Sequence, residues 1–480
     1  MMRSPHALAR RGRPALLVIL VLLWAAGTLR AGLLWSHDPL YAYANSYDQT
    51  RYTSCFHFHP DRPAGVAPQQ NSPQAPFAQF RFITSDDPMC YWSSELAFTG
   101  ATAAVWKLSA ALGAGPSHSV RWTGALRWLA LLALSIAVSM AWLRRGDAPA
   151  ALANAALLPV LFADPANTLY LNTFYAEWSA LLAAYALLAL TLLWREDPAG
   201  RTRFLLLALA ALALATAKIQ HLLLPLAVAG VVALVEFGGT RRIGWRPWAI
   251  GAGALLGLAA QIVQLGRDGA MMDAIDQYNR ADVVFTALLP FADDPAALLA
   301  ELRIDPACAP YSGKHAWEFP DLPEKVCAGL SDFTRGTELA TLVRHPGLAL
   351  RLAAASVAAL DPWIAKNLGT IEGEDFAPLP ASQPSLGRVL HMWPWLRAAC
   401  LAAPWLGAFV LLLVPSRRRG RLLESSLLAA SVMLVTLAVT VLGDGLADTA
   451  KQGHLVTNAA LAWLFAGTAM LAARAFPTTR

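Results

Sequence analysis

Charged side chains interrupt this apolar sequence at a few short stretches. In "LYLNTFYAEWSALL" (169–182) one carboxylate, Glu177, stands among aromatic and aliphatic residues, and "TAKIQHLLLP" (216–225) holds Lys218 and His221 between apolar runs. Ionisable groups in such surroundings are costly to keep, so they mark candidate functional positions. A carboxylate can take a proton from a reacting hydroxyl group, and an ammonium group can hold a phosphate.

A third stretch, "GDGLADTAKQGHLVTNAA" (443–460), repeats the combination. Lys451 and His454 are three residues apart, so a helix would place both on one face. With Lys218, Gln220 and His221 they form a set of candidate ligands for a bound anion, because lysine is a strong point-charge partner for phosphate. The alternative is that Lys451 and His454 are solvated loop residues.

The composition indicates which elements position these groups. Of 480 residues, 56% are hydrophobic and 15% are charged, against roughly a quarter charged in soluble domains. The pattern predicts an all-α polytopic membrane protein with about ten transmembrane helices of roughly 20 residues each. The expected spans are 14–34, 120–143, 149–164, 174–194, 203–217, 219–237, 247–265, 394–414, 423–443 and 455–474.

Arginine clusters predict the orientation. They lie before the first span and after every second one: "RSPHALARRGR", "LRRGD", "WREDPAGRTR", "TRRIGWR", "SRRRGR" and "RAFPTTR". By the positive-inside rule these clusters and both termini are predicted to be cytoplasmic. The apolar core of 14–34 runs on without a clear cleavage site, which favours an uncleaved first span. The segment 347–360 is short and contains Arg351, so we expect a helix on the membrane surface.

This topology divides the chain into five parts. They are the N-terminus with the first span (1–34), a first extracytoplasmic loop (35–119), spans two to seven (120–265), an extracytoplasmic subdomain (266–393), and spans eight to ten with the C-terminus (394–480). A proline-rich stretch, "APLPASQPSLG" (377–387), indicates a linker before the last group of spans.

Four of the five cysteines fall in the two extracytoplasmic parts. We expect disulfides between Cys55 and Cys90 and between Cys308 and Cys327, since an oxidising compartment favours such pairs. The sequence alone does not fix this connectivity, and a chance distribution is the alternative. Cys400 lies in a predicted span.

Glu177 then falls at the extracytoplasmic start of the fourth span, below a short loop that carries Asn172 and Tyr175. Its carboxylate could face a water-filled cavity at the membrane surface, with Asn172 and Tyr175 as candidate substrate-binding groups. The alternative is a hydrogen-bonded packing residue inside the aromatic belt of the interface.

The first extracytoplasmic loop supplies further candidates. Asp38 and Asp48 are possible catalytic carboxylates, and Arg51 would lie one turn beyond Asp48 in a helix. His57 and His59 could ligate a metal, but an isolated HxH pair is more typical of a polar loop. The sequence contains no Walker loop, GxGxxG, HExxH or GxSxG motif, so nucleotide hydrolysis, dinucleotide redox chemistry and zincin or serine hydrolysis have no support.

The layout resembles the GT-C membrane glycosyltransferases. The resemblance rests on the acidic first loop "NSYDQTR", the second acidic site "NTFYAE", and basic residues at further extracytoplasmic span ends. The chain is similar to bacterial members with "FNxFYxE"-like and "KHLFLxN"-like stretches, matched here by "LNTFYAE" and by "KQGHLVTN" with an inserted glycine. The segment 278–306 also looks like the extracytoplasmic region of that group. An adjacent Asp-Glu pair is missing from the first loop, where Asp86 and Asp87 come late.

The resemblance implies transfer of a sugar from a polyprenyl-phosphate carrier to an extracytoplasmic glycan, lipid or protein. Asp48 would act as the base, with Asp38 as its substitute, and Glu177 would orient the acceptor or hold a divalent cation. Lys218, His221, Lys451 and His454, with Arg51, would hold the carrier phosphate. Partners are then the lipid-linked sugar, its acceptor and the bilayer, with no nucleic acid.

Two other classes of function remain open. A transporter or flippase for lipid-linked sugars would also keep ionisable residues in its spans, but it needs access from both faces, and the polar residues here gather at one. A non-catalytic envelope-assembly protein would explain the subdomain 266–393 but not the acids and lysines. That subdomain could select the acceptor or only seal the site.

Overall fold

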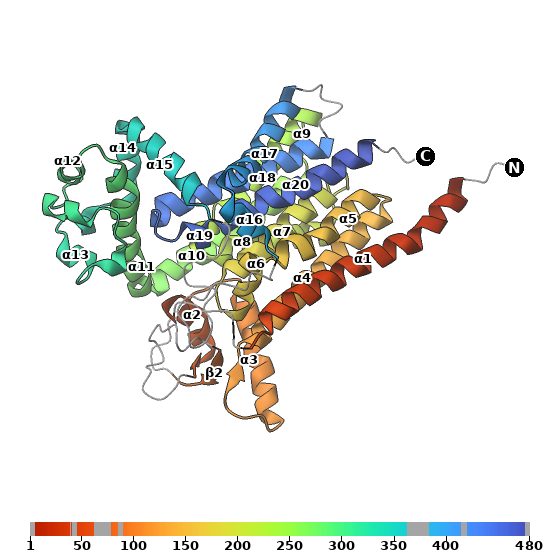
Figure 1. The fold of residues 1–480 in the computed structure, drawn as a ribbon, viewed down its shortest axis with the longest axis horizontal. Coiled ribbons are helices and arrows are strands. Elements are labelled where there is room, and N and C mark those ends of the chain that lie inside the picture. Colours follow the sequence, from red (N-terminus) through yellow and green to blue (C-terminus); the bar gives the residue numbers. More distant parts are fainter. Residues whose placement is uncertain are drawn as a thin grey trace.

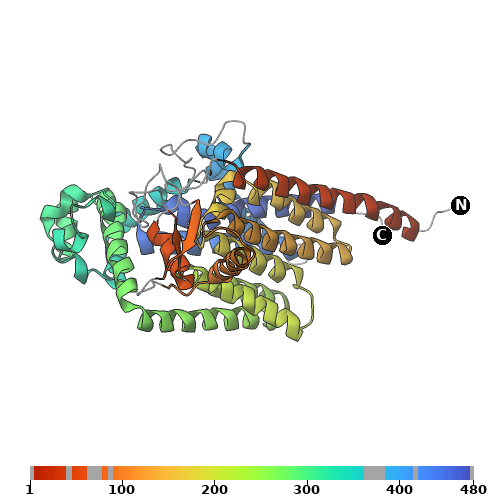
Figure 2. The same cartoon turned by 90° about the horizontal axis from the view of Figure 1, so that it is seen from below.

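The computed structural model describes residues 5–38, 40, 46–61, 78–84, 90–361, 384–413 and 420–475. Most of these residues are helical. The longest helices form a bundle in which the start of α1 and the end of α20 lie at the same end, here called the terminal end (Figure 1). Figure 2 shows the same arrangement from below, with the helices α11–α14 beyond the opposite end of the bundle.

Within the described residues, six helices are long and apolar enough to cross a membrane. They are α1 (Pro5–Trp35), α4 (Arg121–Arg144), η4 (Ile219–His221) continued by α9 (Leu224–Thr240), α10 (Trp245–Arg267), α17 (Pro394–Leu413) and α18 (Gly420–Asp444). α7 (Glu177–Leu193) and α8 (Arg201–Ala217) have 17 residues each, and α20 spans His454–Ala475. The expected count of ten spans is therefore not confirmed.

The third expected span, 149–164, corresponds to the first arm of a bent pair of helices, and the second arm lies where a loop was expected. α5 (Ala148–Leu157) and η2 (Leu158–Phe162) form one arm, α6 (Pro165–Thr168) and η3 (Leu169–Asn172) the other, and the arms meet at 75°. Asp164 causes the break, because its side chain caps the new helix by accepting from the backbone N–H of Ala166 while Pro165 occupies the first helical position. Counting this pair as one span gives seven.

Two glycines allow α8 and α10 to pack closely. A Cβ atom at Gly253 would lie 2.1 Å from the carbonyl oxygen of Ala208, and one at Gly257 would lie 2.4 Å from the Cβ of Ala215. The four-residue spacing of these glycines puts both on one face of α10, as in small-residue contacts between membrane helices.

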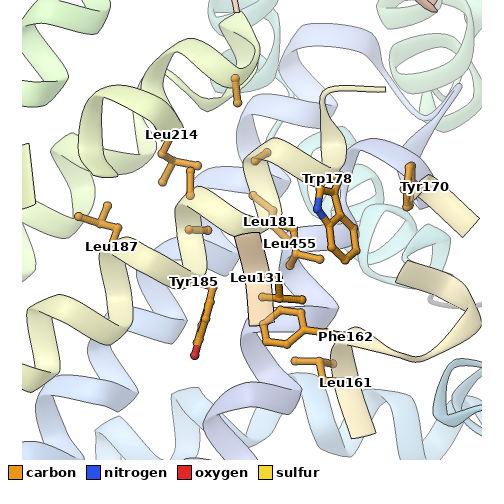
Figure 3. Packing of buried hydrophobic residues seen from close by; sticks show 14 of the residues in the cluster. Leu131, Leu161, Phe162, Tyr170, Trp178, Leu181, Tyr185, Leu187, Leu214 and Leu455 are labelled. Carbon is orange, nitrogen blue, oxygen red and sulfur yellow. The ribbon is translucent and has the colours of Figure 1, made fainter. Parts of the chain in front are cut away.

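The short helix α7 lies at the centre of the bundle. Its side chains Leu181, Tyr185 and Leu187 are buried. Figure 3 shows them among buried residues of four other elements: Leu131 of α4, Phe162 of η2, Leu214 of α8 and Leu455 of α20. Because side chains of α7 pack against several neighbouring elements, the position of its first residue, Glu177, is fixed by packing.

The first large loop folds around aromatic side chains. It contains α2 (Ser46–Thr53), η1 (Ser54–Phe56), α3 (Leu96–Ala111) and an antiparallel sheet of β1 (Phe58–Pro60), β2 (Gln79–Phe82) and β3 (His118–Ser119). Phe58 pairs with Phe82 in register, and Phe58, Phe80 and Trp106 pack on Phe174 from the loop before α7. The small sheet departs from the all-α prediction.

Residues 269–359 form a helical subdomain. Its elements are α11 (Gly269–Asp282), η5 (Val283–Leu288), η6 (Leu289–Phe291), α12 (Pro295–Glu301), η7 (Pro306–Tyr311), η8 (Ala316–Glu318), α13 (Pro323–Val326), η9 (Leu330–Asp332), α14 (Arg335–Arg344) and α15 (Pro346–Ala359). α15 matches the short helix expected at 347–360, and its place on a membrane surface stays a prediction. The remaining described helices are α16 (Leu386–Met392), before α17, and α19 (Thr449–Gln452), between α18 and α20.

Both expected disulfides are present. Cys55 bonds to Cys90 within the first large loop, and Cys308 bonds to Cys327 within the helical subdomain. Cys400 is a free thiol on α17. Most of the expected linker 377–387, and the pair Asp86 and Asp87, lie outside the described residues.

Candidate functional site

Six charged side chains from four parts of the chain meet at the end of the bundle opposite the terminal end. This charged cluster consists of Asp48 and Arg51 of α2, Glu177 of α7, Lys218 from the break between α8 and η4, Asp448 before α19, and Lys451 of α19. Lys218 Nζ lies 2.5 Å from Glu177 Oε1, and Lys451 Nζ lies 2.9 Å from Asp48 Oδ2. Lys451 also pairs with Asp448, and Arg51 pairs with Asp48.

The helix α2 brings Asp48 to this position. Asp48 is in its first turn and Arg51 is three residues later, so they face the same side, as the sequence predicts. Gln49 fixes the helix to the bundle, because its Oε1 accepts a hydrogen bond from the backbone N–H of Phe174 (3.0 Å). The disulfide of Cys55 holds the other end of this segment.

Asp48 and Lys451 are both held in their charged forms. Burial alone would raise the pKa of the Asp48 carboxyl group, but the Lys451 ammonium and then the Arg51 guanidinium outweigh burial and keep this pKa well below its usual range. For Lys451, burial lowers the pKa, whereas Asp448 and Asp48 raise it well above the usual value. Asp48 is therefore a weak proton acceptor.

Glu177 is fully buried and only half satisfied. Its Oε1 accepts a hydrogen bond from Lys218 Nζ, and its Oε2 has no hydrogen-bond partner among the described residues. As the first residue of α7, the carboxylate also lies at a helix N-terminus, where negative charge is favoured. Lys218 reaches it because the chain is extended there (φ −149°, ψ 156°), which ends α8 and turns the side chain toward α7.

Further buried polar atoms, on residues close in sequence to Glu177 or to Lys218, lack hydrogen-bond partners in the described part of the chain. They are both ring nitrogens of His221, Nε2 of Gln220 and both amide atoms of Asn172. Leaving such groups unsatisfied costs roughly 1–3 kcal/mol each. His221 is close enough to Glu177 to interact with its charge, and an unpartnered ring there is typical of a site that a polar ligand or water completes.

His454 and Tyr175 close the cluster on the side of α20. The ring nitrogens of His454 lie 2.9 Å from the carbonyl oxygen of Lys451 and 3.1 Å from that of Glu177. A neutral imidazole can donate to only one of these two acceptors. Lys451 Nζ lies 5.0 Å from the centre of the Tyr175 ring, within the range of a cation–π contact.

One predicted catalytic residue lies elsewhere. The Asp38 side chain is 88% exposed and pairs with Arg121 (3.3 Å) at the start of α4. His59 lies in β1 opposite Arg81, and His57 is in the turn before that strand. Over the described residues, no group of three or more His, Cys, Asp or Glu side chains could hold a metal ion.

Two buried residues that the sequence does not single out support the site. Arg127 of α4 donates to the carbonyl oxygens of Tyr170 (2.9 Å), Thr173 (2.6 Å) and Tyr175 (3.0 Å), and it pairs with Glu95 Oε1 (2.6 Å). Glu95 Oε2 in turn accepts from Ser179 of α7 (2.5 Å). The only sequence signal for this pair is an arginine seven residues inside a predicted span, where charge is costly.

An apolar cavity of about 160 Å³ begins one turn away from the cluster. Its walls come from α4, α5, α7, α18 and α20. Leu181 lies four residues after Glu177 and Leu455 directly follows His454, whereas Trp142 and Arg421 line the terminal end of the cavity. A charged cluster over a hydrocarbon-like cavity matches the two ends of an amphiphilic molecule.

A comparison with protein families matches residues 107–347 to the YfdI N-terminal transmembrane domain, which covers about half of the chain. The chain belongs to the YfdI family. It is accordingly a multi-pass membrane protein in contact with the bilayer. The matched YfdI region contains Glu177, Lys218 and Arg127, while α2 and α19 with Asp48 and Lys451 lie outside it. No curated protein and no solved structure matches this chain.

Proposed function

We propose that this YfdI-family protein is a GT-C type glycosyltransferase. It would transfer a sugar from a polyprenyl-phosphate carrier to an extracytoplasmic glycan, lipid or protein acceptor. The charged cluster would face the extracytoplasmic side of a bacterial inner membrane, and both termini would be cytoplasmic. The predicted alternation of spans puts the arginine clusters on the same side as both termini, which supports this orientation.

One observation carries the proposal: the charged cluster combines paired cations, an incompletely satisfied carboxylate and unpartnered polar groups directly above an apolar cavity. Each component matches one part of a lipid-linked sugar. The cations suit its phosphate, the unpartnered groups suit sugar hydroxyls, and the cavity suits a stretch of its isoprenoid chain.

In the proposed reaction, an acceptor hydroxyl oxygen forms a bond to the anomeric carbon of the sugar while the bond from that carbon to the phosphate oxygen breaks. The hydroxyl proton passes to a carboxylate, and the lipid phosphate leaves with the electron pair. Lys218, Lys451 and Arg51 would stabilise the charge that develops on the phosphate. His221 and Gln220 would contribute hydrogen bonds.

The geometry favours Glu177 over Asp48 as the base. Both carboxylates form an ion pair with a lysine, but each oxygen of Asp48 has a cationic partner, Arg51 on Oδ1 and Lys451 on Oδ2. Glu177 keeps one oxygen without a partner. We therefore assign proton removal to Glu177 Oε2, and to Asp48 the orientation of Lys451 toward the phosphate.

The test is sugar transfer by the purified full-length protein with a panel of polyprenyl-phosphate sugars. Glu177→Gln is expected to lower the transfer rate by about 100-fold or more, the usual contribution of a general base. Asp48→Asn is expected to raise the KM for the lipid-linked donor more than it lowers kcat. Asp38→Asn is the matched control, because it makes the same change on the same loop away from the cluster.

Several results would contradict the proposal. Transfer that survives both Glu177→Gln and Asp48→Asn would remove the cluster from the reaction. Binding of the lipid-linked sugar without turnover would favour a transporter or an assembly protein. Assays with EDTA and with added Mg²⁺ decide the open question of a divalent cation.

A further inference from the structure

The helix α3 in the first large loop is apolar on two opposite sides. One side packs on the aromatic core of the loop through Ala103 and Trp106, which are buried. Leu108 (62% exposed) and Leu112 (80% exposed) lie on the other side. The exposed positions there are three or four residues apart and therefore share one face, here called the outer face: Ala97, Ala101, Ala104, Leu108 and Leu112.

The outer face does not have the composition of a face in contact with water. A helix that is half exposed to water carries charged and polar residues on its exposed side. The only charged residue of α3 is Lys107, which lies beside the outer face with its ammonium group 5.5 Å from the centre of the Phe82 ring. A helix that is apolar all round is typical of a protein core or a membrane. Because the loop covers only one side of α3, the outer face needs a second apolar environment.

Contacts with α4 place α3 at the extracytoplasmic edge expected for a membrane span. α4 is long and apolar enough to cross a membrane. Glu95, the residue before α3, pairs with Arg127 of α4 (2.6 Å), and Thr102 donates to Thr123 of α4 (3.1 Å). At roughly 1.5 Å per residue, Arg127 lies about 9 Å and Thr123 about 3 Å along α4 from its first residue. α3 therefore starts below the end of this span and rises to the level of its first turn.

The direction of α3 differs from that of the bundle. Figure 1 shows α3 leaving the bundle across the direction of α1 and α4, and Figure 2 shows it nearly end-on from below. A helix that runs across the spans at the level of their ends lies in the plane of the membrane surface. With 16 residues, α3 is also shorter than a helix that crosses the bilayer.

The exposed face of α4 begins beside its contact with α3. Trp122, the neighbour of Thr123, is exposed, and Leu129 and Ile136 follow it as exposed residues. Intervals of seven residues are close to two helical turns, so these three side chains lie on one face of α4. A tryptophan at the end of such a face is typical of the membrane interface. The surface of α4 that faces lipid is thus continuous with the region of α3.

We propose that the outer face of α3 lies on the lipid bilayer, between the headgroups and the first part of the acyl chains. The bilayer covers Leu108 and Leu112, and the long side chain of Lys107 reaches the polar headgroups. The aromatic core of the first large loop covers α3 from the other side. This inference goes beyond the proposed function and does not depend on it, because it concerns only the contact between the loop and the membrane.

The contact has a consequence for the candidate site. Glu95 at the start of α3 pairs with Arg127 and accepts a hydrogen bond from Ser179 of α7 (2.5 Å), two residues after Glu177. Lipid contact along α3 therefore holds the start of α7 at a fixed depth below the membrane surface.

Spin labels measure the surroundings of the outer face in the full-length protein in nanodiscs. Single cysteines are introduced into a Cys400→Ser background, which removes the free thiol and keeps both disulfides. Ala104→Cys and Leu108→Cys report on the outer face. Leu129→Cys on α4 is the reference for lipid, and Gln79→Cys, exposed on β2, is the reference for water. Oxygen collides mainly with labels in lipid, and a water-soluble nickel chelate collides mainly with labels in water.

The ratio of oxygen to nickel collision rates at Ala104→Cys and Leu108→Cys should exceed that at Gln79→Cys several-fold and approach that at Leu129→Cys. Further labels along 97–112 should show this ratio rising and falling with a period of about 3.6 residues. Both positions are exposed, so the labels should leave the thermal unfolding temperature of the Cys400→Ser protein unchanged.

Three results would overturn the inference. A ratio at the outer face equal to that at Gln79→Cys would place this face in water. Low collision rates with both reagents would show that other parts of the protein cover it. Spin–spin broadening between Ala104→Cys labels of two chains would show that a second copy of the chain, rather than lipid, occupies the outer face.

Discussion

Two buried charge networks occupy opposite ends of the helix bundle. At the terminal end, Glu424 of α18 pairs with Arg246 (2.7 Å) through one oxygen and with Arg195 (2.7 Å) through the other. Arg246 also pairs with Glu236 of α9 (2.8 Å) and donates to the carbonyl oxygen of Thr191 (2.8 Å). This arginine network therefore ties together α7, α9, α10 and α18.

The charged cluster at the other end is built from similar residue types but is incomplete. Glu424 has a guanidinium group within ion-pair distance of each oxygen, although its Oε2 makes no hydrogen bond, whereas the described residues give Glu177 one direct cationic partner, Lys218 on Oε1, and give the ring of His221 no hydrogen bond. A network in which each charge faces an opposite charge is costly to break and leaves no net charge for a ligand. A network with unpartnered polar groups can still bind a ligand. This difference distinguishes the charged cluster, as a candidate site, from the arginine network, as a structural element.

The largest expected effect is the opposite response of Glu424→Gln and Glu177→Gln in thermal unfolding and in transfer rate. Glu424→Gln removes one of the two counter-charges of the buried Arg246 and the nearer counter-charge of the partly exposed Arg195, and breaking a buried ion pair typically costs about 3–5 kcal/mol of the free energy of unfolding. We expect a marked fall in the thermal unfolding temperature with little loss of transfer per folded molecule. Glu177→Gln should do the reverse, since its carboxylate is only half used in packing.

The control for this contrast is Glu196→Gln. Glu196 belongs to the same end of the bundle, but its side chain is 72% exposed and lies 3.9 Å from Arg195. Exposed pairs of this kind contribute little, so its unfolding temperature should stay near that of wild type. If Glu177→Gln destabilised the protein as much as Glu424→Gln, the distinction between the two networks would be wrong.

Sequence reasoning predicted the candidate site better than the bundle. Glu177, Lys218 and Lys451 are far apart in the chain, yet the alternation of spans and arginine clusters places all three at one end. The disulfides were predictable for the same reason, because each pair falls within one segment that the arginine clusters predict to be extracytoplasmic. The alternation of the spans alone therefore predicts which residues share an end of the bundle, even when their packing is not known.

What the sequence could not supply depends on packing. Only the family resemblance ranks Asp48 before Asp38 as the base. In the structure, the docking of Gln49 on Phe174 brings Asp48 to Lys451, whereas Asp38 pairs with Arg121. The strands β1–β3 have two to four residues each, too short for an alternating pattern to be recognised. The 75° bend follows from the capping geometry at Asp164, which the apolar composition around it conceals.

A smaller effect is expected from Arg127→Lys, which tests how the open cluster is positioned. The guanidinium holds three carbonyl oxygens of the segment before Glu177 together with Glu95. Lysine keeps the charge but cannot span these acceptors with its single ammonium group. We expect the rate at saturating donor to fall about 10–100-fold, the cost of a misplacement on the order of 1 Å at a reacting centre.

Arg121→Lys is the matched control for this variant. It makes the same change on the same helix, but Arg121 pairs with the exposed Asp38 outside the cluster. Its transfer rate should equal that of wild type. An Arg127→Lys protein with a wild-type rate and a lowered unfolding temperature would show that Arg127 only stabilises the fold.

The smallest effect concerns Asp282, which joins the helical subdomain to the open end of the bundle. Burial and then the neighbouring Asp444 carboxylate raise the pKa of Asp282 to about 8, from an ordinary value of 3.8. The folded state therefore holds a proton that the unfolded state releases, so its contribution to stability is full below about pH 4 and is lost as the pH rises to about 8.

Asp282→Asn removes this titration while keeping an oxygen that can accept from the backbone N–H of Ala316. The thermal unfolding temperature of wild type should fall between pH 5 and pH 9 by a few degrees more than that of the variant. Asp273→Asn, an exposed change on the same helix, should follow wild type at every pH. If all three proteins showed the same pH dependence of the unfolding temperature, protonation of Asp282 would not contribute to the stability of the folded protein. The helical subdomain would then not be coupled to the charged cluster through the protonation of Asp282.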